Sequence, residues 1–96
     1  MSIEDKLWKA SSKGDLSLVK NLIEEYGANI HYDDEYALQW ASFNGHLEVV
    51  KYLVKKGANI HTRNDRCLMC ASDNGHLEIV DYFKNLIRKE KINRIL

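Results

Sequence analysis

The stretch NGHLEVVKYLVKKGANIH, from Asn44 to His61, decides the fold because the chain repeats it. Its opening returns as NGHLEIVDYF from Asn74, and its closing GANIH has already occurred from Gly27. The equivalent glycines lie 30 or 31 residues apart, at Gly14, Gly45 and Gly75 and again at Gly27 and Gly57. Self-similarity at a fixed period of this size predicts a solenoid of stacked units.

Each repeat predicts two short helices. The apolar residues after Gly45 are Leu47, Val49, Val50, Leu53 and Val54, which is helical spacing rather than alternation. A second segment precedes each glycine, as LWKASSK, LQWASFN and LMCASDN, and carries Leu before an Ala-Ser pair. Gly45 and Gly57 are expected to close helices in the left-handed conformation. The predicted helices lie near residues 4–12, 15–25, 36–44, 46–55, 66–74 and 76–92.

Length and charge set limits on the function. The 96 residues suit one domain, and the 14 basic and 14 acidic residues cancel, which argues against a nucleic-acid partner. The charges are unevenly placed. Residues 1–48 hold 9 acids and 4 bases, a net −5, and residues 49–96 hold 5 acids and 10 bases, a net +5. Three interpretations stay open: the polarity steers an encounter with a partner, it favours head-to-tail self-contact, or an elongated molecule simply carries it. A monomer or weak self-association is expected.

The first ten residues and the low number of cysteines both predict a location inside the cell. The opening MSIEDKLWKA carries charges where a signal peptide needs an apolar core, and no apolar run reaches the length of a membrane span. Two cysteines are too few for a disulfide framework. The sequence therefore predicts a soluble, cytoplasmic protein with reduced thiols and no membrane partner.

The segment NGHLEVVKYLVKKGANI resembles the second half of the ankyrin repeat, and the resemblance covers about residues 3–87. It implies an all-α ankyrin-repeat solenoid of three stacked helix-turn-helix units in a single domain, 1–96. These would be an N-terminal capping repeat at 1–30, a central repeat at 31–60, and a C-terminal capping repeat with an extended helix at 61–96. The form YAL.WAS.NGHLEVVKYLV is similar to repeats of large DNA viruses of amoebae, which implies a viral protein in the host cytoplasm.

The repeat departs from the family pattern at its turns. The usual period is 33 residues, and the loss here falls between His31 and Tyr36 and between His61 and Arg66. Ankyrin repeats project a β-hairpin finger at this place, so the resemblance implies shortened fingers, with a tight turn and little or no strand. The family's loop-tying histidine is replaced by Trp8, Gln39 and Met69. A weak or absent tie is therefore expected.

The two ends carry polar changes that suit terminal repeats. Lys6 and Lys9 would face the place of an earlier repeat, and Lys84 stands where the central repeat has Val54. The apolar residues expected to lengthen the last helix and fold over the open end are Leu86, Ile87, Ile92 and Ile95. Three units are the usual minimum for stability, so the chain is expected to be complete.

The sequence contains few residues in patterns that suit catalysis or cofactor binding. Cys67 and Cys70 form a C-x-x-C at a predicted helix start, where a helix dipole lowers a thiol pKa, so a thiol redox or metal-binding protein is the alternative function. No βαβ pattern surrounds them, and zinc would need two further ligands. The four histidines are spread by the repeat period. No paired carboxylates, nucleophile triad or phosphate-binding glycine loop occurs, so neither an enzyme nor a cofactor is expected.

The acidic run Asp33-Asp34-Glu35 leaves two interpretations open. Acidic side chains before a helix can cap its amino end and complement its dipole. They can also recognise a basic partner.

The family resemblance implies a non-catalytic protein–protein interaction module, whose unidentified partner meets the turn tips and the exposed face of the first helices. The matching turn residues are Tyr32, Asp33, Asp34, Glu35, Thr62, Arg63, Asn64 and Asp65. The matching positions before the glycines are Ser12, Lys13, Phe43, Asn44, Asp73 and Asn74. Phe43 stands where the other repeats have Ser12 and Asp73, so the frame does not require an aromatic there. We expect Phe43 to be an exposed binding anchor and Trp40 to pack between repeats.

Overall fold

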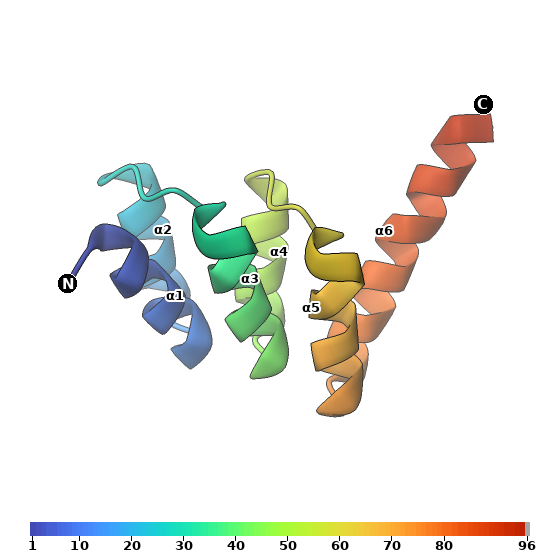
Figure 1. The fold of residues 1–96 in the computed structure, drawn as a ribbon, viewed down its shortest axis with the longest axis horizontal. Helices are drawn as coiled ribbons and strands as arrows, with labels where there is room; N and C mark the ends of the chain where they lie inside the picture. Colours follow the sequence, from blue (N-terminus) through green and yellow to red (C-terminus); the bar gives the residue numbers. More distant parts are fainter. Residues whose placement is uncertain (96) are drawn as a thin grey trace.

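The computed structural model describes residues 1–95, which contain six helices and no strand (Figure 1). The helices are α1 (Ile3–Lys13), α2 (Leu16–Glu24), α3 (Tyr32–Phe43), α4 (Leu47–Lys55), α5 (Thr62–Asp73) and α6 (Leu77–Ile95). The predicted all-α fold is confirmed. The main differences from the predicted ranges are the earlier starts of α3 and α5 and the longer α6.

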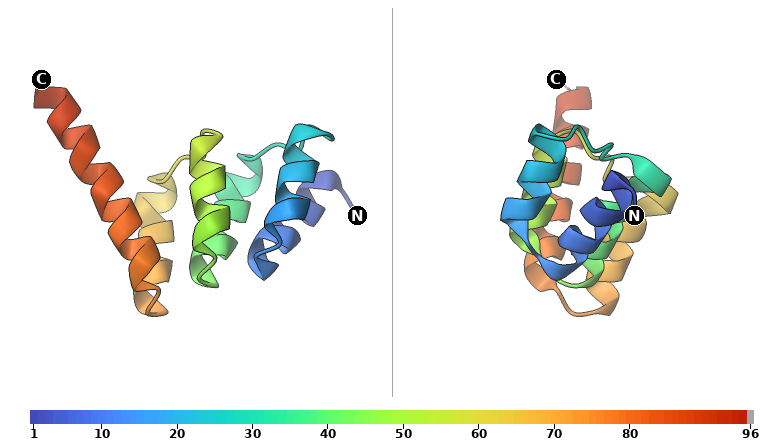
Figure 2. Two further views of the ribbon diagram at one scale, coloured as in Figure 1. Left: turned by 180° about the vertical axis from the view of Figure 1, so that it is seen from behind. Right: turned by 90° about the vertical axis from the view of Figure 1, so that its left-hand side faces the viewer.

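The helices are arranged as three antiparallel pairs, α1/α2, α3/α4 and α5/α6, stacked along the longest axis of the molecule (Figure 1). The first helices α1, α3 and α5 form one layer, and α2, α4 and α6 form the other (Figure 2). The molecule measures 42 × 29 × 22 Å. This arrangement is the predicted solenoid, in which each pair contacts only its neighbours.

Equivalent residues of the three pairs fill the core. The buried positions shared by all three are Ala10, Ala41 and Ala71, then Val19, Val50 and Val80, then Leu22, Leu53 and Phe83. The alanines let the two helices of a pair approach closely, and the larger residues fill the space between pairs. A short helix is marginal alone, so this packing on both sides stabilises the central pair most.

The predicted glycine caps are present and also join neighbouring pairs. Gly45 ends α3 with a φ of 81°, and the amide of His46 donates to the carbonyl of Ala41 at 2.9 Å. The ring of His76, from the third pair, lies directly against Gly45: a Cβ there would be 2.5 Å from His76 Nδ1. Glycine is therefore required both by the backbone conformation and by the close approach of the histidine.

Both histidines that follow these caps tie one pair to the next. His46 Nε2 lies 2.8 Å from the carbonyl oxygen of Ser12, and His76 Nε2 lies 2.9 Å from that of Phe43. These carbonyls belong to the last turn of a first helix, where no intrahelical donor is available. The repeated histidines are therefore structural.

Left-handed turns replace the hairpin fingers. Residues 33–35 have φ values of 53°, 55° and 65°, and residues 63–65 have 51°, 57° and 63°. Neither turn is part of a strand, as predicted, but three successive non-glycine residues in the left-handed region were not predicted. Aspartate and asparagine tolerate this region better than most residues. Right-handed helix begins after each turn, at the predicted positions Tyr36 and Arg66.

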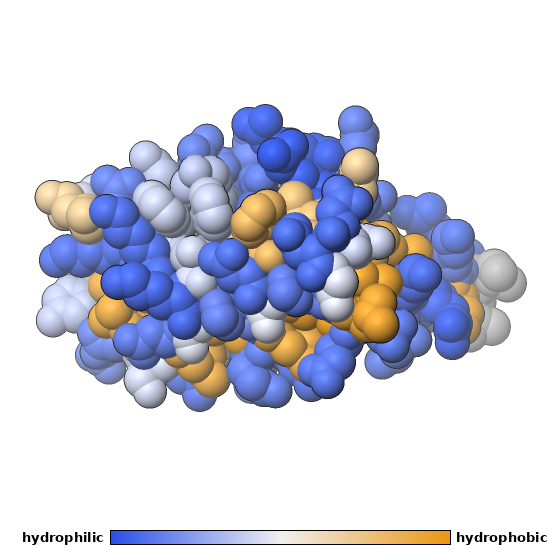
Figure 3. Space-filling model, turned by 90° about the horizontal axis from the view of Figure 1, so that it is seen from below, coloured by the Kyte–Doolittle hydropathy of each residue, from blue (hydrophilic) through white to orange (hydrophobic). Residues whose placement is uncertain are grey.

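The C-terminal helix is extended, but its expected packing is only partly correct. α6 leans away from α5 toward its carboxyl end (Figure 1). Leu86 and Ile87 pack against the core, whereas Ile92 is 47% exposed and does not fold over the open end. The side chain of Ile95 lies outside what the structure describes. The face seen from below, where the helices of each pair connect, shows hydrophobic side chains between hydrophilic ones (Figure 3). Leu77, which follows the third connection, is 69% exposed.

Candidate functional site

Most residues predicted for the binding face have accessible side chains. Those classed as exposed are Lys13, Tyr32, Asp33, Asp34, Phe43, Asn44, Arg63, Asn64, Asp73 and Asn74, and those that are half-buried are Ser12, Thr62 and Asp65. They belong to the layer of first helices and to the left-handed turns at the start of α3 and α5. The exception is Glu35.

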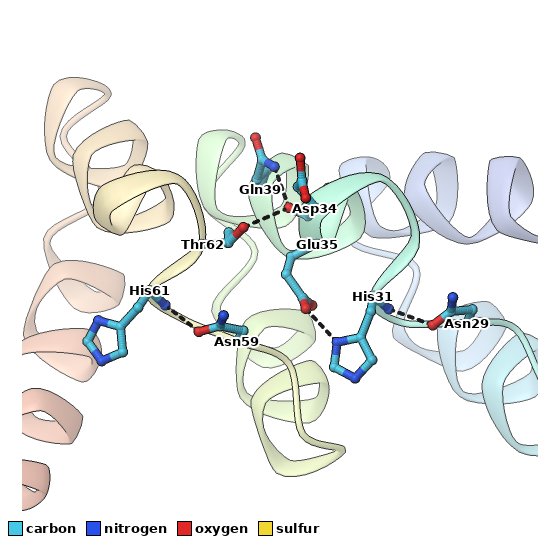
Figure 4. A network of polar contacts seen from close by, with 8 residues as sticks. All are labelled: Asn29, His31, Asp34, Glu35, Gln39, Asn59, His61 and Thr62. Carbon is cyan, nitrogen blue, oxygen red and sulfur yellow. Dashed lines mark hydrogen bonds and ion pairs between the residues drawn. The ribbon is translucent and has the colours of Figure 1, made fainter.

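Glu35 corrects the prediction, because its side chain is only 5% exposed and is not available on the face. The left-handed turn directs its carboxylate inward, where Oε1 lies 2.5 Å from Nδ1 of His31 (Figure 4). The amide of His31 is in turn held by the side chain of Asn29 at 3.0 Å. Glu35 therefore stabilises the turn from inside.

The acidic run does not present three free charges. Asp34 forms an ion pair of 2.8 Å with Arg63 of the following turn. The Asp34 carbonyl accepts hydrogen bonds from Gln39 at 2.6 Å and from Thr62 at 3.4 Å (Figure 4). No side chain of the run caps the amino end of α3. Asp34 is paired with Arg63 and Glu35 is buried against His31, so within residues 1–95 only Asp33 of the three presents an exposed carboxylate without such a partner. This weakens the interpretation that the run recognises a basic partner.

The same contacts correct the expected loss of the loop tie. Gln39 stands where the family has its histidine, and its amide nitrogen reaches the turn that precedes its own helix. Trp8 differs, since its Nε1 donates to Asp5 of its own helix α1 at 3.3 Å. The tie is therefore replaced in the central pair.

Four aromatic rings gather on the layer of first helices. Trp40 stacks on Trp8 of the preceding pair, with ring centroids 5.8 Å apart. The edge-on contacts of Trp40 reach Tyr36 at 6.0 Å and Phe43 at 5.5 Å, and Trp8 meets Tyr36 at 5.2 Å. Trp40 thus packs between pairs as predicted. Because each ring packs against at least one other, the positions of the four rings on this surface are well defined.

A hollow of about 190 Å³ opens beside these rings, between α3 and α5. The residues that line this aromatic hollow are Tyr36, Gln39, Trp40, Phe43, Arg66 and Cys70. Phe43 is 42% exposed. The hollow has apolar walls and one cationic side chain, a composition suited to holding a side chain of a partner.

Sequence reasoning found Phe43 but missed most of the hollow. The predicted face used turn tips and helix ends, whereas Tyr36, Gln39 and Arg66 lie in the helices themselves. A usable signal was present, because Tyr36 and Trp40 are four residues apart, as are Gln39 and Phe43. This spacing places each pair on one side of a helix.

The cysteines give no support to the redox or metal alternative. Both thiols are free, Cys67 is buried and Cys70 is half-buried. Burial raises the pKa of the Cys67 thiol to about 12, so the nucleophilic thiolate is strongly disfavoured. Within residues 1–95, no group of three or more His, Cys, Asp or Glu side chains is placed to hold a metal ion.

Comparison with known proteins identifies the repeat. A family model of ankyrin repeats, in three copies, matches residues 7–94. An ankyrin repeat protein of Acanthamoeba polyphaga mimivirus is 67% identical over 30 residues, which are 31% of this chain and 12% of that protein. A protein S-acyltransferase of Arabidopsis thaliana is 36% identical over 52 residues, 51% of this chain and 10% of that protein. The chain thus matches only small parts of both relatives. None of the helices in residues 1–95 has the length and apolar character to span a membrane.

Proposed function

Because the chain belongs to the ankyrin-repeat family, we propose that it is a non-catalytic module that binds a protein partner through the layer of α1, α3 and α5. Ankyrin repeats generally serve protein–protein interaction rather than catalysis. Stacked repeats provide an extended surface on which variable side chains are carried by a constant frame. The partner is a protein still to be identified.

The observation that carries this proposal is the exposed ring of Phe43 beside the aromatic hollow. The frame accepts serine and aspartate at the equivalent positions, so the ring is not needed for packing. The ring of Phe43 lies 5.5 Å from that of Trp40 in an edge-to-face arrangement, and the residue is 42% exposed. Exposed aromatic residues beside a hollow are typical centres of binding energy.

The turn residues form the rim of the proposed face. Arg63 and Asp34 hold each other across neighbouring turns, so both are already positioned before a partner arrives. Asp33 and Asn64 are exposed beside them. Charges at a rim mainly affect association rate and salt dependence rather than the final affinity.

The free thiols and the likeness to a mimivirus protein support a cytoplasmic location, in the host cell if the chain is viral. The plant acyltransferase match covers 10% of that enzyme. We therefore extend to this chain the binding role and not the reaction.

The test is affinity capture from the native host with the 96-residue chain, followed by mass spectrometry. Phe43→Ala should weaken binding of a captured protein by at least about 2 kcal/mol while leaving thermal stability nearly unchanged. Tyr26→Ala is the matched control, since Tyr26 is exposed but lies after α2, away from the proposed face. If Phe43→Ala unfolds the chain, or binding is unaffected, the face is wrongly assigned.

A further inference from the structure

The charge that borders the aromatic hollow belongs to Arg66. Its side chain is exposed, and within residues 1–95 no carboxylate forms an ion pair with it. Arg63, three residues earlier on α5, differs because its guanidinium is held by Asp34 at 2.8 Å. Arg66 therefore has its charge available to a ligand, whereas Arg63 has already found a partner.

The aromatic hollow continues toward the turns. A second hollow of about 170 Å³ is lined by Asp33, Tyr36, Gln39, Arg63 and Arg66. Three of these residues, Tyr36, Gln39 and Arg66, also line the aromatic hollow. The two hollows therefore adjoin along α3 and α5 and are treated below as one groove, with Arg66 lining both parts.

A second cationic side chain lies at the other end of the ring cluster, where Lys9 holds its ammonium 5.6 Å from the ring centroid of Trp8. Two carboxylates lie nearby: Asp5 accepts a hydrogen bond from Trp8, and Asp33 lines the second hollow with Arg63 and Arg66. Arg66 is the cation that lines the aromatic hollow itself.

We propose, resting on the binding role above, that this groove takes an acidic peptide segment of the partner protein, in which a large apolar side chain adjoins carboxylates. The apolar side chain fills the aromatic hollow between Trp40 and Phe43. A neighbouring Asp or Glu carboxylate pairs with Arg66, whose planar guanidinium matches it with two parallel hydrogen bonds.

The charges favour a peptide over a nucleic acid. Aromatic rings and cations together also suit single-stranded nucleic acid, but such sites use a positive groove that follows the phosphate backbone. Here the chain's charges cancel, and of the two arginines that line the groove Arg63 is already paired with Asp34. One unpaired guanidinium next to one apolar hollow instead matches a single carboxylate next to a single apolar side chain.

The experiment selects phage-displayed random linear peptides on the full chain and measures the affinities of the selected peptides for purified variants. The expected peptides carry an aromatic or long aliphatic residue flanked by Asp or Glu. Arg66→Gln should weaken their binding by about 10-fold or more, because a charge-assisted hydrogen bond is lost. Arg63→Gln is the matched control and should change the affinity by less than about 2-fold, since that charge is already paired.

Each outcome decides between the two proposals. Peptides that lose affinity on Phe43→Ala but carry neutral or basic flanks, or that do not respond to Arg66→Gln, overturn the acidic ligand while the binding face stands. Peptides that are indifferent to Phe43→Ala overturn the face itself, as does a selection that yields none. Equal losses of peptide affinity with Arg63→Gln and Arg66→Gln would indicate general charge attraction and contradict a specific pair between Arg66 and a peptide carboxylate. Oligothymidylate binding that is lost on Phe43→Ala would replace the peptide by a nucleic acid.

Discussion

Gly45 and Gly75 close successive first helices with nearly the same backbone, at φ values of 81° and 73°, yet their surroundings differ completely. The His76 ring packs against Gly45, whereas a Cβ added to Gly75 would meet nothing within 4 Å. Ser42 is fully buried, and its equivalent Ser72 is exposed. The same sequence signal therefore produces the same local backbone, but it contributes to stacking only where a neighbouring pair follows.

This difference indicates that the contacts between neighbouring helix pairs, here called junctions, contribute much of the stability of the molecule. In a solenoid, the total is close to a sum of unit terms and nearest-neighbour terms. The central pair has a junction on both sides, and the described residues place nothing on the outer side of Gly75. Changes at equivalent positions should consequently differ in size according to the neighbour they meet.

The largest expected effect is at the centre of the stack. Leu53 is 1% exposed between pairs, so Leu53→Ala should lower the free energy of unfolding by about 2–5 kcal/mol through the cavity it leaves. Leu77→Ala, at an exposed leucine, should cost less than about 0.5 kcal/mol. Urea unfolding followed by circular dichroism measures both. A loss below about 1 kcal/mol for Leu53→Ala would show that it is not core.

The two glycines test the junction directly. Both Gly45→Ala and Gly75→Ala place a side chain in the left-handed region, which costs about 1–2 kcal/mol. Gly45→Ala must also displace the His76 ring, so it should cost at least about 1 kcal/mol more, within the usual range for overpacking. Thermal and urea unfolding compare them. Adding His76→Ala to each glycine variant should remove the difference between their losses of stability. Equal losses for Gly45→Ala and Gly75→Ala in the chain that retains His76 would show that the contact between His76 and Gly45 does not contribute.

A third comparison sets the left-handed turns against the helices. Asp33 has a φ of 53° and is exposed, so Asp33→Gly should relieve strain and raise stability by up to about 1 kcal/mol. Arg88→Gly, in exposed right-handed helix of α6, should lower it by roughly 0.5–1 kcal/mol. Opposite signs in urea unfolding are the expected result. Destabilisation by Asp33→Gly would mean that the aspartate is favoured in this turn.

The smallest expected effect is the pH dependence contributed by His61, in the turn that begins α5. His61 lies 2.8 Å from Glu90 on α6 and 2.5 Å from Asp65, and these hydrogen bonds, Glu90 first, raise its pKa above the usual 6.5. His31 contacts the equivalent acid, Glu35, which is buried, whereas His61 also reaches across to a residue of α6.

A group whose pKa is higher in the folded state stabilises the fold when protonated. The His61 contribution should therefore be complete below about pH 6.5, while the carboxylates remain ionised, and should disappear as the pH rises through the folded pKa. Its size should be under about 1 kcal/mol because the pairs are partly exposed. Unfolding of the chain and of His61→Asn from pH 5 to 9 measures the difference. A gap between them that widens with rising pH would contradict the assignment.

The sequence by itself determined the helix pairs, their order and their closing glycines. The apolar stripe of Leu47, Val50 and Leu53 and the left-handed cap at Gly45 depend on residues close together in the chain, so periodicity is enough to predict them. The exposure of Phe43 also followed from comparing its position across the repeats.

Only the tertiary structure decided which side chains of different turns and helix pairs contact one another. Glu35 turns inward because three residues before Tyr36 adopt positive φ, a choice that propensity alone disfavours. Arg63 and Arg66 have the same charge on the same helix, yet Asp34 of the preceding turn occupies only one of them. The groove exists because α3 and α5 lie side by side, bringing Phe43 and Arg66 to one hollow. Local patterns determine backbone and burial, whereas contacts between separate turns depend on how the pairs stack in space.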